Sequence, residues 1–160
     1  MPQCAYIALI TGGTTVPKET APPTLVGCEL FVRKDRAILL GKRKNCYGAG
    51  TWALPGGHLE FNERLVDAVC REAKEELGAI VKPQQLRMVS VVDDLQPQNN
   101  LHYVHISFEL RDPQWEPRIM EPERCAEWRY FALDDLPSNF FEPHVGIIDN
   151  YLAQRLYLLQ

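Results

Sequence analysis

The pattern of apolar and polar residues along the 160-residue chain predicts several β-strands. Residues 25–32 and 37–43 are rich in strand-forming residues and are separated by the charged stretch RKDR, so we expect them to pair. Residues 102–110 alternate between apolar and polar positions. We expect one face of this strand to be core, and the other face, which carries His105, to be polar enough to line a site. Further strands are predicted over the stretches TWALP, LRMVSVVDD and EWRYF.

Two stretches have the periodicity of amphipathic helices. The first begins after Asn62, which we expect to be its N-cap, and ends near Gly78, a good C-cap. Its apolar stripe consists of Leu65, Val66, Val69, Cys70, Ala73 and Leu77. At the C-terminal end, helical spacing recurs at Val145, Ile148, Leu152, Leu156 and Leu159. Strands on both sides of a central helix, with a second helix at the end, predict an α/β fold in which helices pack on both sides of a mixed sheet.

Three glutamates, Glu72, Glu75 and Glu76, crowd like charges into five residues of the first helix. Like charges three or four positions apart on a helix repel one another. These three lie along the margin of the apolar stripe, where the dielectric is lower than on a solvated face. Two interpretations stay open. One is an acidic helix face stabilised by neighbouring Lys and Arg; the other is a divalent-cation site, because Mg²⁺, Mn²⁺ and Ca²⁺ prefer carboxylate oxygens.

The composition fits one domain with an ordinary core, since 46% of the residues are apolar and 24% are charged. We expect residues 1–23 to be an N-terminal extension or edge segment and residues 24–160 to form the domain. A formal net charge of −4 argues against binding nucleic-acid polymers through a general basic surface. The five cysteines are scattered and lack CxxC spacing, so neither a disulfide framework nor a zinc site is indicated. The apolar run at residues 5–10 is too short for a membrane span, and we therefore expect a soluble cytoplasmic protein.

The acidic helix belongs to a longer motif with fixed spacing. Gly57 is followed by five residues and Glu63, and then by seven residues and the run REAKEELG at residues 71–78. This motif resembles the signature of the Nudix hydrolases. Ala73 and Ala79 stand where the family usually has a bulkier aliphatic residue, which affects packing and leaves every carboxylate in place.

The likeness extends from about Leu25 to Pro143. Over this range the sequence is similar to the nucleoside triphosphate diphosphatases of the Nudix hydrolase 15 type. The stretches that carry it are LLGKRK, GAGTWALPGGHLEF, HYV, MEPERC, EWRYF and LP. The resemblance implies an α/β/α sandwich with a catalytic loop-helix-loop, often a homodimer, that uses Mg²⁺ or Mn²⁺ to cleave a nucleoside diphosphate linked to another group. For this branch it implies hydrolysis of (d)NTPs, oxidised or modified purine nucleotides included, to monophosphate and pyrophosphate, with a role in nucleotide pool sanitation.

By the same resemblance, the metal ligands are the three clustered carboxylates and the carbonyl of Gly56. The residues implied for catalysis are Arg71, Glu72, Glu75 and Glu76. Which carboxylate acts as the general base is left open. The resemblance assigns Glu63 to the geometry of the loop and helix rather than to catalysis.

The resemblance also assigns residues to the nucleotide. Arg43 matches a position near the phosphates, and Gly57 and His105 are expected beside the substrate. Phe141 matches a position that stacks on the base, and Glu142, which stands where relatives often have Trp, is expected to line the same pocket. From the residues alone each has a simpler alternative: Arg43 as a charged strand end, His105 as a surface histidine, and Phe141 as a core or interface aromatic.

Two other functions stay open on the sequence. The same chemistry could act on another diphosphate, such as ADP-ribose, a nucleotide sugar or a prenyl diphosphate. The fold could also persist as a non-catalytic nucleotide-binding module, although the intact glutamates argue against this. The partner expected first is a nucleotide substrate, with no nucleic-acid polymer and no membrane.

Overall fold

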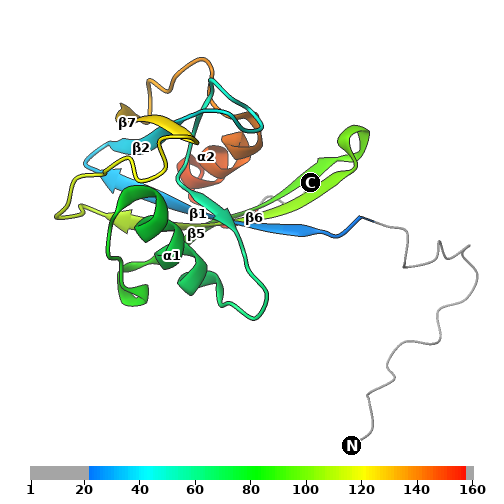
Figure 1. The fold of residues 1–160 in the computed structure, drawn as a ribbon, viewed down its shortest axis with the longest axis horizontal. Coiled ribbons are helices and arrows are strands. Elements are labelled where there is room, and N and C mark those ends of the chain that lie inside the picture. Colours follow the sequence, from blue (N-terminus) through cyan, green and yellow to red (C-terminus); the bar gives the residue numbers. More distant parts are fainter. Residues whose placement is uncertain (1–21, 158–160) are drawn as a thin grey trace, which may run out of the picture.

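A mixed β-sheet forms the centre of the computed structural model, which describes residues 22–157 (Figure 1). The main path of the sheet runs β3-β2-β1-β6-β5, with β4 paired to β1 and β7 paired to β2. Strands β1 and β6 run parallel, and the other strand pairs are antiparallel. The strands are β1 (Leu25–Lys34), β2 (Ala37–Arg43), β3 (Trp52–Ala53), β4 (Gly56–His58), β5 (Arg87–Gln96), β6 (Leu101–Arg111) and β7 (Cys125–Ala132).

Strand β1 is the central strand and is buried on both faces over residues 27–32. Its sequence is therefore a nearly continuous apolar run rather than an alternation. The exception in this run is Glu29, which is 3% exposed. In the parallel pairing with β6, Gly27 lies opposite His105 and Glu29 lies opposite Ser107. The fold thus places a carboxylate at the centre of the sheet, one strand away from a histidine.

The helices are α1 (Leu65–Leu77) and α2 (Val145–Leu152), with short 3-10 helices η1 (Pro83–Gln85), η2 (Pro97–Asn99) and η3 (Glu142–His144). Leu77 of α1 belongs to the same buried cluster as Leu30, whereas Ile147 of α2 belongs to the cluster of Phe31. Because neighbouring residues of a strand point to opposite faces, the two α-helices cover opposite faces of the sheet (Figure 1). The α/β/α sandwich predicted from the sequence is confirmed.

The start of α1 differs from the prediction. Its N-cap is Arg64, whose backbone is extended, and not Asn62. Asn62 has a left-handed φ of 64°, so it serves the turn that precedes the helix and cannot take the extended conformation of an N-cap. The predicted end is confirmed: Gly78 is left-handed with a φ of 67°, and its N–H donates to the carbonyl of Lys74.

Helix α2 is shorter than its apolar periodicity predicted. It ends at Leu152, and Gln154 turns the chain with a left-handed φ of 54°. The chain then reaches the edge strand β5, where the N–H of Val91 donates to the carbonyl of Leu156 at 2.7 Å. Leu156 falls at helical spacing but pairs with the sheet edge, a difference that periodicity alone does not resolve. Leu159 lies outside the described residues.

The polar face of β6 contributes to two places. His105, 6% exposed, lines a pocket, as expected for a face that lines a site. Farther along the strand, the carboxylate of Glu109 is buried and accepts a hydrogen bond from the hydroxyl of Tyr151 at 2.7 Å. Arg87 and Arg111 pair with the same carboxylate at 2.8 and 2.9 Å. This face therefore carries a pocket residue at one end and a buried ion-pair group at the other.

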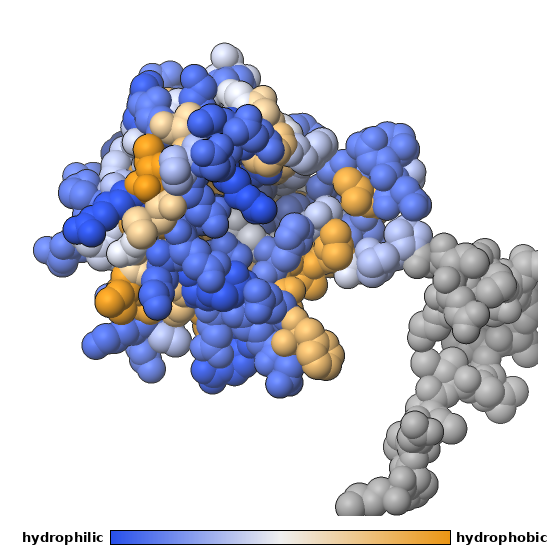
Figure 2. All heavy atoms as spheres, in the orientation of Figure 1, coloured by the Kyte–Doolittle hydropathy of each residue, from blue (hydrophilic) through white to orange (hydrophobic). Residues whose placement is uncertain are grey.

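Residues 1–21 and 158–160 lie outside the described part of the chain, so the expected N-terminal extension over residues 1–23 falls almost wholly outside it. Between residues 22 and 157, no helix is long and apolar enough to cross a membrane. The side of the molecule seen in Figure 2 is mostly hydrophilic, with apolar residues in small separate groups. The described cysteines, which are free thiols, are Cys28, Cys46, Cys70 and Cys125.

Candidate active site

Strand β4, which begins with Gly56 and Gly57, and the turn after it form a loop that packs tightly against β1 and α1, called the glycine loop below. Gly56 has a φ of 142°, and a Cβ there would lie 2.3 Å from the carbonyl oxygen of Cys28. A Cβ on Gly57 would lie 2.3 Å from Oε1 of Glu72. Gly56 therefore requires glycine, for its backbone conformation and its contact with the β1 backbone, whereas a side chain at Gly57 would displace the Glu72 carboxylate.

Arg71 joins this loop to the helix. Its guanidinium donates to the two carboxylate oxygens of Glu63 at 3.0 and 3.1 Å, and also to the carbonyl of His58 at 2.9 Å. Glu63 in turn accepts the N–H of Glu60 at 3.1 Å. The hydrogen bond from Arg71 holds the pKa of Glu63 below its ordinary value. The pair fixes the shape of the loop, in line with the part expected for Glu63.

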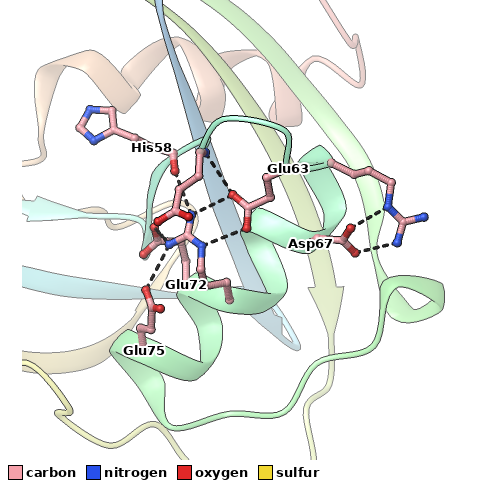
Figure 3. Close-up of polar contacts among 8 residues, drawn as sticks. His58, Glu63, Asp67, Glu72 and Glu75 are labelled. Atoms are coloured by element: carbon pink, nitrogen blue, oxygen red, sulfur yellow. Dashed lines mark hydrogen bonds and ion pairs between the residues drawn. The ribbon is translucent and has the colours of Figure 1, made fainter.

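The three clustered glutamates face the same loop. Nη1 of Arg71 donates to Glu72 at 2.6 Å and to Glu75 at 3.1 Å (Figure 3). The side chain of Glu72 is 13% exposed, whereas that of Glu75 is 50% exposed. Glu76 accepts the N–H of Gly56 at 2.8 Å. One turn of helix thus brings Glu72 and Glu76 to the glycine loop, with Glu75 beside them on Arg71.

The cluster has more negative than positive charge. Arg71 faces Glu63, Glu72 and Glu75, while Glu76 makes no ion pair with any residue between 22 and 157. Burial raises the pKa of Glu76 to about 8; the hydrogen bond from Gly56 opposes this rise, and the charge of Glu72 adds to it. Burial also raises the pKa of Glu72. Carboxylates in this environment suit a hard divalent cation, whose charge would offset their repulsion.

A pocket of about 390 Å³ opens beside this cluster. It is lined by Glu76 and by four of the five residues expected on the substrate side: Arg43, Gly57, His105 and Phe141. The fifth, Glu142, is exposed and does not line the pocket. The expectation that Glu142 lines it is therefore corrected: η3 turns Glu142 to solvent and buries the residues on either side of it.

Arg43 and Phe141 lie against one another in the pocket. The guanidinium carbon of Arg43 lies 4.3 Å from the centre of the Phe141 ring, and Nε of Arg43 donates to the carbonyl of Tyr47 at 2.8 Å. The ring of Tyr47 meets Phe141 edge-on, with centroids 5.8 Å apart. Phe141 is 7% exposed, so one side of the pocket is an aromatic surface covered by a cation.

The pocket residues that were not found from the sequence include Glu29, Asp94 and His144. Nδ1 of His105 lies 2.6 Å from the carboxylate of Glu29, and Nε2 lies 3.6 Å from Asp94. His144 is 5% exposed, and its Nε2 is 3.9 Å from Glu29. One signal was available: Glu29 is the single charged residue in the apolar run LVGCELFV, and a charge in a core strand needs a partner.

Glu29, His105 and His144 also form a group whose ligand atoms all lie within 4.8 Å of one another and could hold a metal ion. The hydrogen bonds favour a different use. The N–H of Leu54 donates to Nδ1 of His144 at 3.2 Å, so the neutral ring carries its proton on Nε2, where a metal would need a lone pair. Burial and the nearby charges of His105 and Arg43 hold the pKa of His144 well below its ordinary value.

The charge on His105 is set by its two carboxylate neighbours. Burial lowers the pKa of His105, but the hydrogen bond and charge of Glu29, with the charge of Asp94, outweigh burial and raise it. His105 and His144 lie 5.4 Å apart, centre to centre. Two histidines at one end of the pocket are thus driven in opposite directions, one toward the cation and the other toward the neutral ring.

Comparison with known proteins agrees with this geometry. The protein-family model described as the NUDIX domain matches residues 22–151 of this chain. An ADP-ribose pyrophosphatase of Methanocaldococcus jannaschii is 38% identical over 127 residues, which are 79% of this chain and 72% of that protein. An 8-oxo-dGTP diphosphatase of Buchnera aphidicola subsp. Schizaphis graminum is 28% identical over 120 residues, 74% of this chain and 85% of that protein. The crystal structure of a MutT NUDIX hydrolase from Burkholderia pseudomallei has a TM-score of 0.75 and 36% identity, covering 81% of this chain and 98% of that one.

These matches confirm the family expected from the glycine loop and the acidic helix. The finer likeness to the Nudix hydrolase 15 type stays a prediction. The two named relatives act on different substrates, so membership of the family leaves the substrate open. The chain belongs to the Nudix hydrolase family and is a hydrolase that acts on phosphoric anhydride bonds.

Proposed function

We propose that this chain is a divalent-metal-dependent nucleoside triphosphate pyrophosphohydrolase, which converts (d)NTPs to monophosphate and pyrophosphate. The observation that carries the proposal is that Glu76 belongs both to the acidic cluster and to the pocket. Its carboxylate belongs to the acidic cluster at the glycine loop, and it also lines the pocket that holds Arg43, His105 and Phe141. A nucleotide suits this arrangement, because its phosphates need the charge at one end and its base needs the enclosed pocket at the other.

Nudix hydrolases need divalent metal ions, and the acidic cluster is suited to hold one. We assign Glu72, Glu75 and Glu76, with the carbonyl of Gly56, as the residues that would bind Mg²⁺ or Mn²⁺. The ion would neutralise charge on the phosphates and lower the pKa of the attacking water. The support from the chain itself is the excess of carboxylates over the one guanidinium and the raised pKa of Glu76.

We assign Arg71 as a positioning residue for the loop and the acidic cluster. Its guanidinium holds the carbonyl of His58 and the carboxylate of Glu72 at the same time, so it sets the loop and one acidic group relative to each other. In the reaction, water adds across one P–O–P linkage, and its proton passes to a base. Glu72, Glu75 and Glu76 all stay candidates for that base.

The nucleotide end of the pocket has its own assignments. Arg43 would pair with the phosphates and Phe141 would stack on the base, once the guanidinium that now covers the ring turns to the phosphates. Gly57 keeps the space beside Glu72 clear. His105 lies on the pocket wall. We leave Glu142 out of the substrate-binding set because its side chain is exposed outside the pocket.

A second candidate is hydrolysis of ADP-ribose, because the relative from Methanocaldococcus jannaschii bears the name ADP-ribose pyrophosphatase. The relative from Buchnera aphidicola is named as an 8-oxo-dGTP diphosphatase and favours a modified purine triphosphate instead. With a modified purine triphosphate as substrate, the cellular role would be sanitation of the nucleotide pool in the cytoplasm.

Product analysis separates these candidates. The purified chain is given each of the four dNTPs, 8-oxo-dGTP and ADP-ribose, with Mg²⁺ or Mn²⁺, and the products are resolved by anion-exchange chromatography. We expect monophosphate and pyrophosphate from a triphosphate at a higher kcat/KM than AMP and ribose 5-phosphate from ADP-ribose. Faster turnover of ADP-ribose would replace the first candidate with the second. Turnover of none of them would contradict both.

A further inference from the structure

One wall of the pocket carries connected polar side chains that begin at the centre of the sheet. The carboxylate of Glu29 lies 2.6 Å from Nδ1 of His105 and accepts the hydroxyl of Ser107 at 3.1 Å. The other ring nitrogen of His105 faces Asp94 of β5 at 3.6 Å. Asp94 also accepts the amide of Gln96 at 2.7 Å. Except for Ser107, all of these residues line the pocket.

One ring nitrogen of His105, Nε2, has no hydrogen-bond partner in the described part of the chain. The side chain of His105 is 7% exposed, and Nε2 itself is buried. A separation of 3.6 Å from Asp94 is too long for a hydrogen bond. Glu29 faces Nδ1 and a second carboxylate faces Nε2, so the surroundings favour a proton on each nitrogen, with Nε2 as a donor. Buried donors are nearly always paired, so this one indicates an acceptor that a ligand brings.

We propose, on the basis of the triphosphate hydrolysis proposed above, that His105 and Asp94 recognise the hydrogen-bonding edge of the substrate's base and select guanine over adenine. Nε2 of His105 donates to the carbonyl oxygen of guanine, and Asp94 accepts the neighbouring ring N–H. Adenine has an amino group in place of the carbonyl and a ring nitrogen without hydrogen in place of the N–H. Adenine therefore sets a donor against His105 and an acceptor against Asp94.

The charge of the wall favours the same choice. Glu29 and Asp94 lie on either side of the His105 ring, so two carboxylates face one histidine on this wall. His144 is neutral beside them and adds no charge. A negative wall attracts an edge with several N–H donors, and guanine offers its amino group in addition to the ring N–H. A buried site that pairs with specific polar groups rejects a ligand that leaves those groups unpaired.

Equilibrium binding of dGMP and dAMP to the metal-free, full-length chain tests this without turnover. Calorimetry on the parent should show dGMP binding at least about 10-fold tighter than dAMP. Asp94→Asn keeps the size of the side chain but adds amide donors, and we expect it to weaken dGMP binding about 10-fold or more. The affinity for dAMP should change much less. Asp93→Asn is the matched control, because Asp93 is exposed on the same strand and contacts Tyr157; it should leave both affinities unchanged.

Two substitutions of His105 test the donor atom itself. Asparagine places its amide nitrogen near the position of Nδ1 and can keep the contact with Glu29, whereas glutamine places it near Nε2. We expect His105→Asn to lose the preference for dGMP and His105→Gln to retain more of it. Circular dichroism of each variant separates this effect from loss of the fold.

The outcomes separate this inference from the function on which it rests. Equal affinities of the parent for dGMP and dAMP, or an unchanged affinity ratio in Asp94→Asn, would overturn base recognition by this wall even if triphosphates are hydrolysed. A preference for dGMP that depends on Asp94, in a chain that hydrolyses no triphosphate, would support the inference and overturn the proposed function.

Discussion

The guanidinium of Arg71 makes two hydrogen bonds to the carboxylate of Glu63, at 3.0 and 3.1 Å, across the turn between the glycine loop and α1. The same guanidinium holds Glu72 at 2.6 Å. The shape of the loop and the position of an acidic side chain are therefore coupled through one residue. We therefore expect Glu63 to affect turnover through Arg71, although its own carboxylate is occupied by the loop.

Glu63→Gln tests the coupling. The neutral amide loses the charge-assisted pair with Arg71, so we expect the free energy of unfolding to fall by about 1–2 kcal/mol, together with a lower kcat. Urea unfolding and steady-state kinetics measure the two effects. Asp67→Asn is the control, because Asp67 forms a more exposed pair with Arg64, and its substitution should cost much less stability. Equal losses in the two variants would contradict the coupling.

Gly57→Ala tests the fit of the loop against the acidic cluster. The added methyl would lie 2.3 Å from Oε1 of Glu72, so the carboxylate must move. We expect the affinity for Mn²⁺ to fall about 10-fold or more, by analogy with changes near other metal sites. Gly50→Ala is the control: it has open space but a φ of 89°, so it should lower stability by about 1 kcal/mol and leave Mn²⁺ affinity unchanged. Unaltered Mn²⁺ affinity in Gly57→Ala would count against a role for Glu72 as a ligand.

Removal of the metal should abolish turnover and leave the fold intact. The core is built from apolar clusters on both faces of the sheet, and the carboxylates lie at its margin. With excess chelator we expect no hydrolysis and an unchanged circular dichroism spectrum. Added Mn²⁺ should raise the Tm of the parent, since a ligand that binds the folded state stabilises it. If hydrolysis continues in excess chelator, the metal assignment fails.

The buried carboxylate of Glu109 predicts a dependence of stability on pH. Burial alone would raise its pKa, but the hydrogen bonds from Tyr151, Arg87 and Arg111 outweigh burial and hold it below the ordinary value of 4.5. Since the folded pKa is the lower one, the carboxylate stabilises the fold above the unfolded pKa. This contribution is lost as the pH falls through the folded pKa.

We therefore expect Glu109→Gln to lower the free energy of unfolding by about 1–3 kcal/mol near neutral pH, and by less as the pH falls below about 4.5. Urea unfolding of parent and variant between about pH 4 and pH 7 measures this difference. Glu116→Gln, at a side chain that is 75% exposed, should show little pH-dependent difference. A Glu109→Gln deficit that grows with acidity would contradict the sign of the pKa shift.

The sequence predicted the parts of the site that depend on local spacing. Gly57, Glu63 and the run from Arg71 to Gly78 lie in one continuous loop and helix, so their register along the chain already fixes which side chains meet. The fold class followed from the order of strands and helices for the same reason.

The sequence did not predict the wall formed by Glu29, Asp94 and His144. These residues come from β1, β5 and η3. Glu29 meets His105 because β1 and β6 pair in parallel, and Asp94 reaches the same ring because β5 pairs with β6 on the other side. The register between strands that lie far apart in the sequence cannot be predicted from the periodicity of apolar residues. Glu142 illustrates the same limit, because one turn of η3 decided that it faces solvent while its neighbours line the pocket.

Metal-dependent hydrolysis of triphosphates at the acidic cluster is tested by Mg²⁺-dependent release of pyrophosphate from a dNTP by the parent, by Glu76→Gln and by Glu60→Gln. Glu76→Gln can still accept the N–H of Gly56 but lacks the charge of a metal ligand. We expect pyrophosphate from the parent, a loss of about 10²-fold or more in kcat/KM for Glu76→Gln, and parent-like rates for Glu60→Gln, whose side chain is exposed. Parent-like release by Glu76→Gln across a range of Mg²⁺ concentrations would contradict the account.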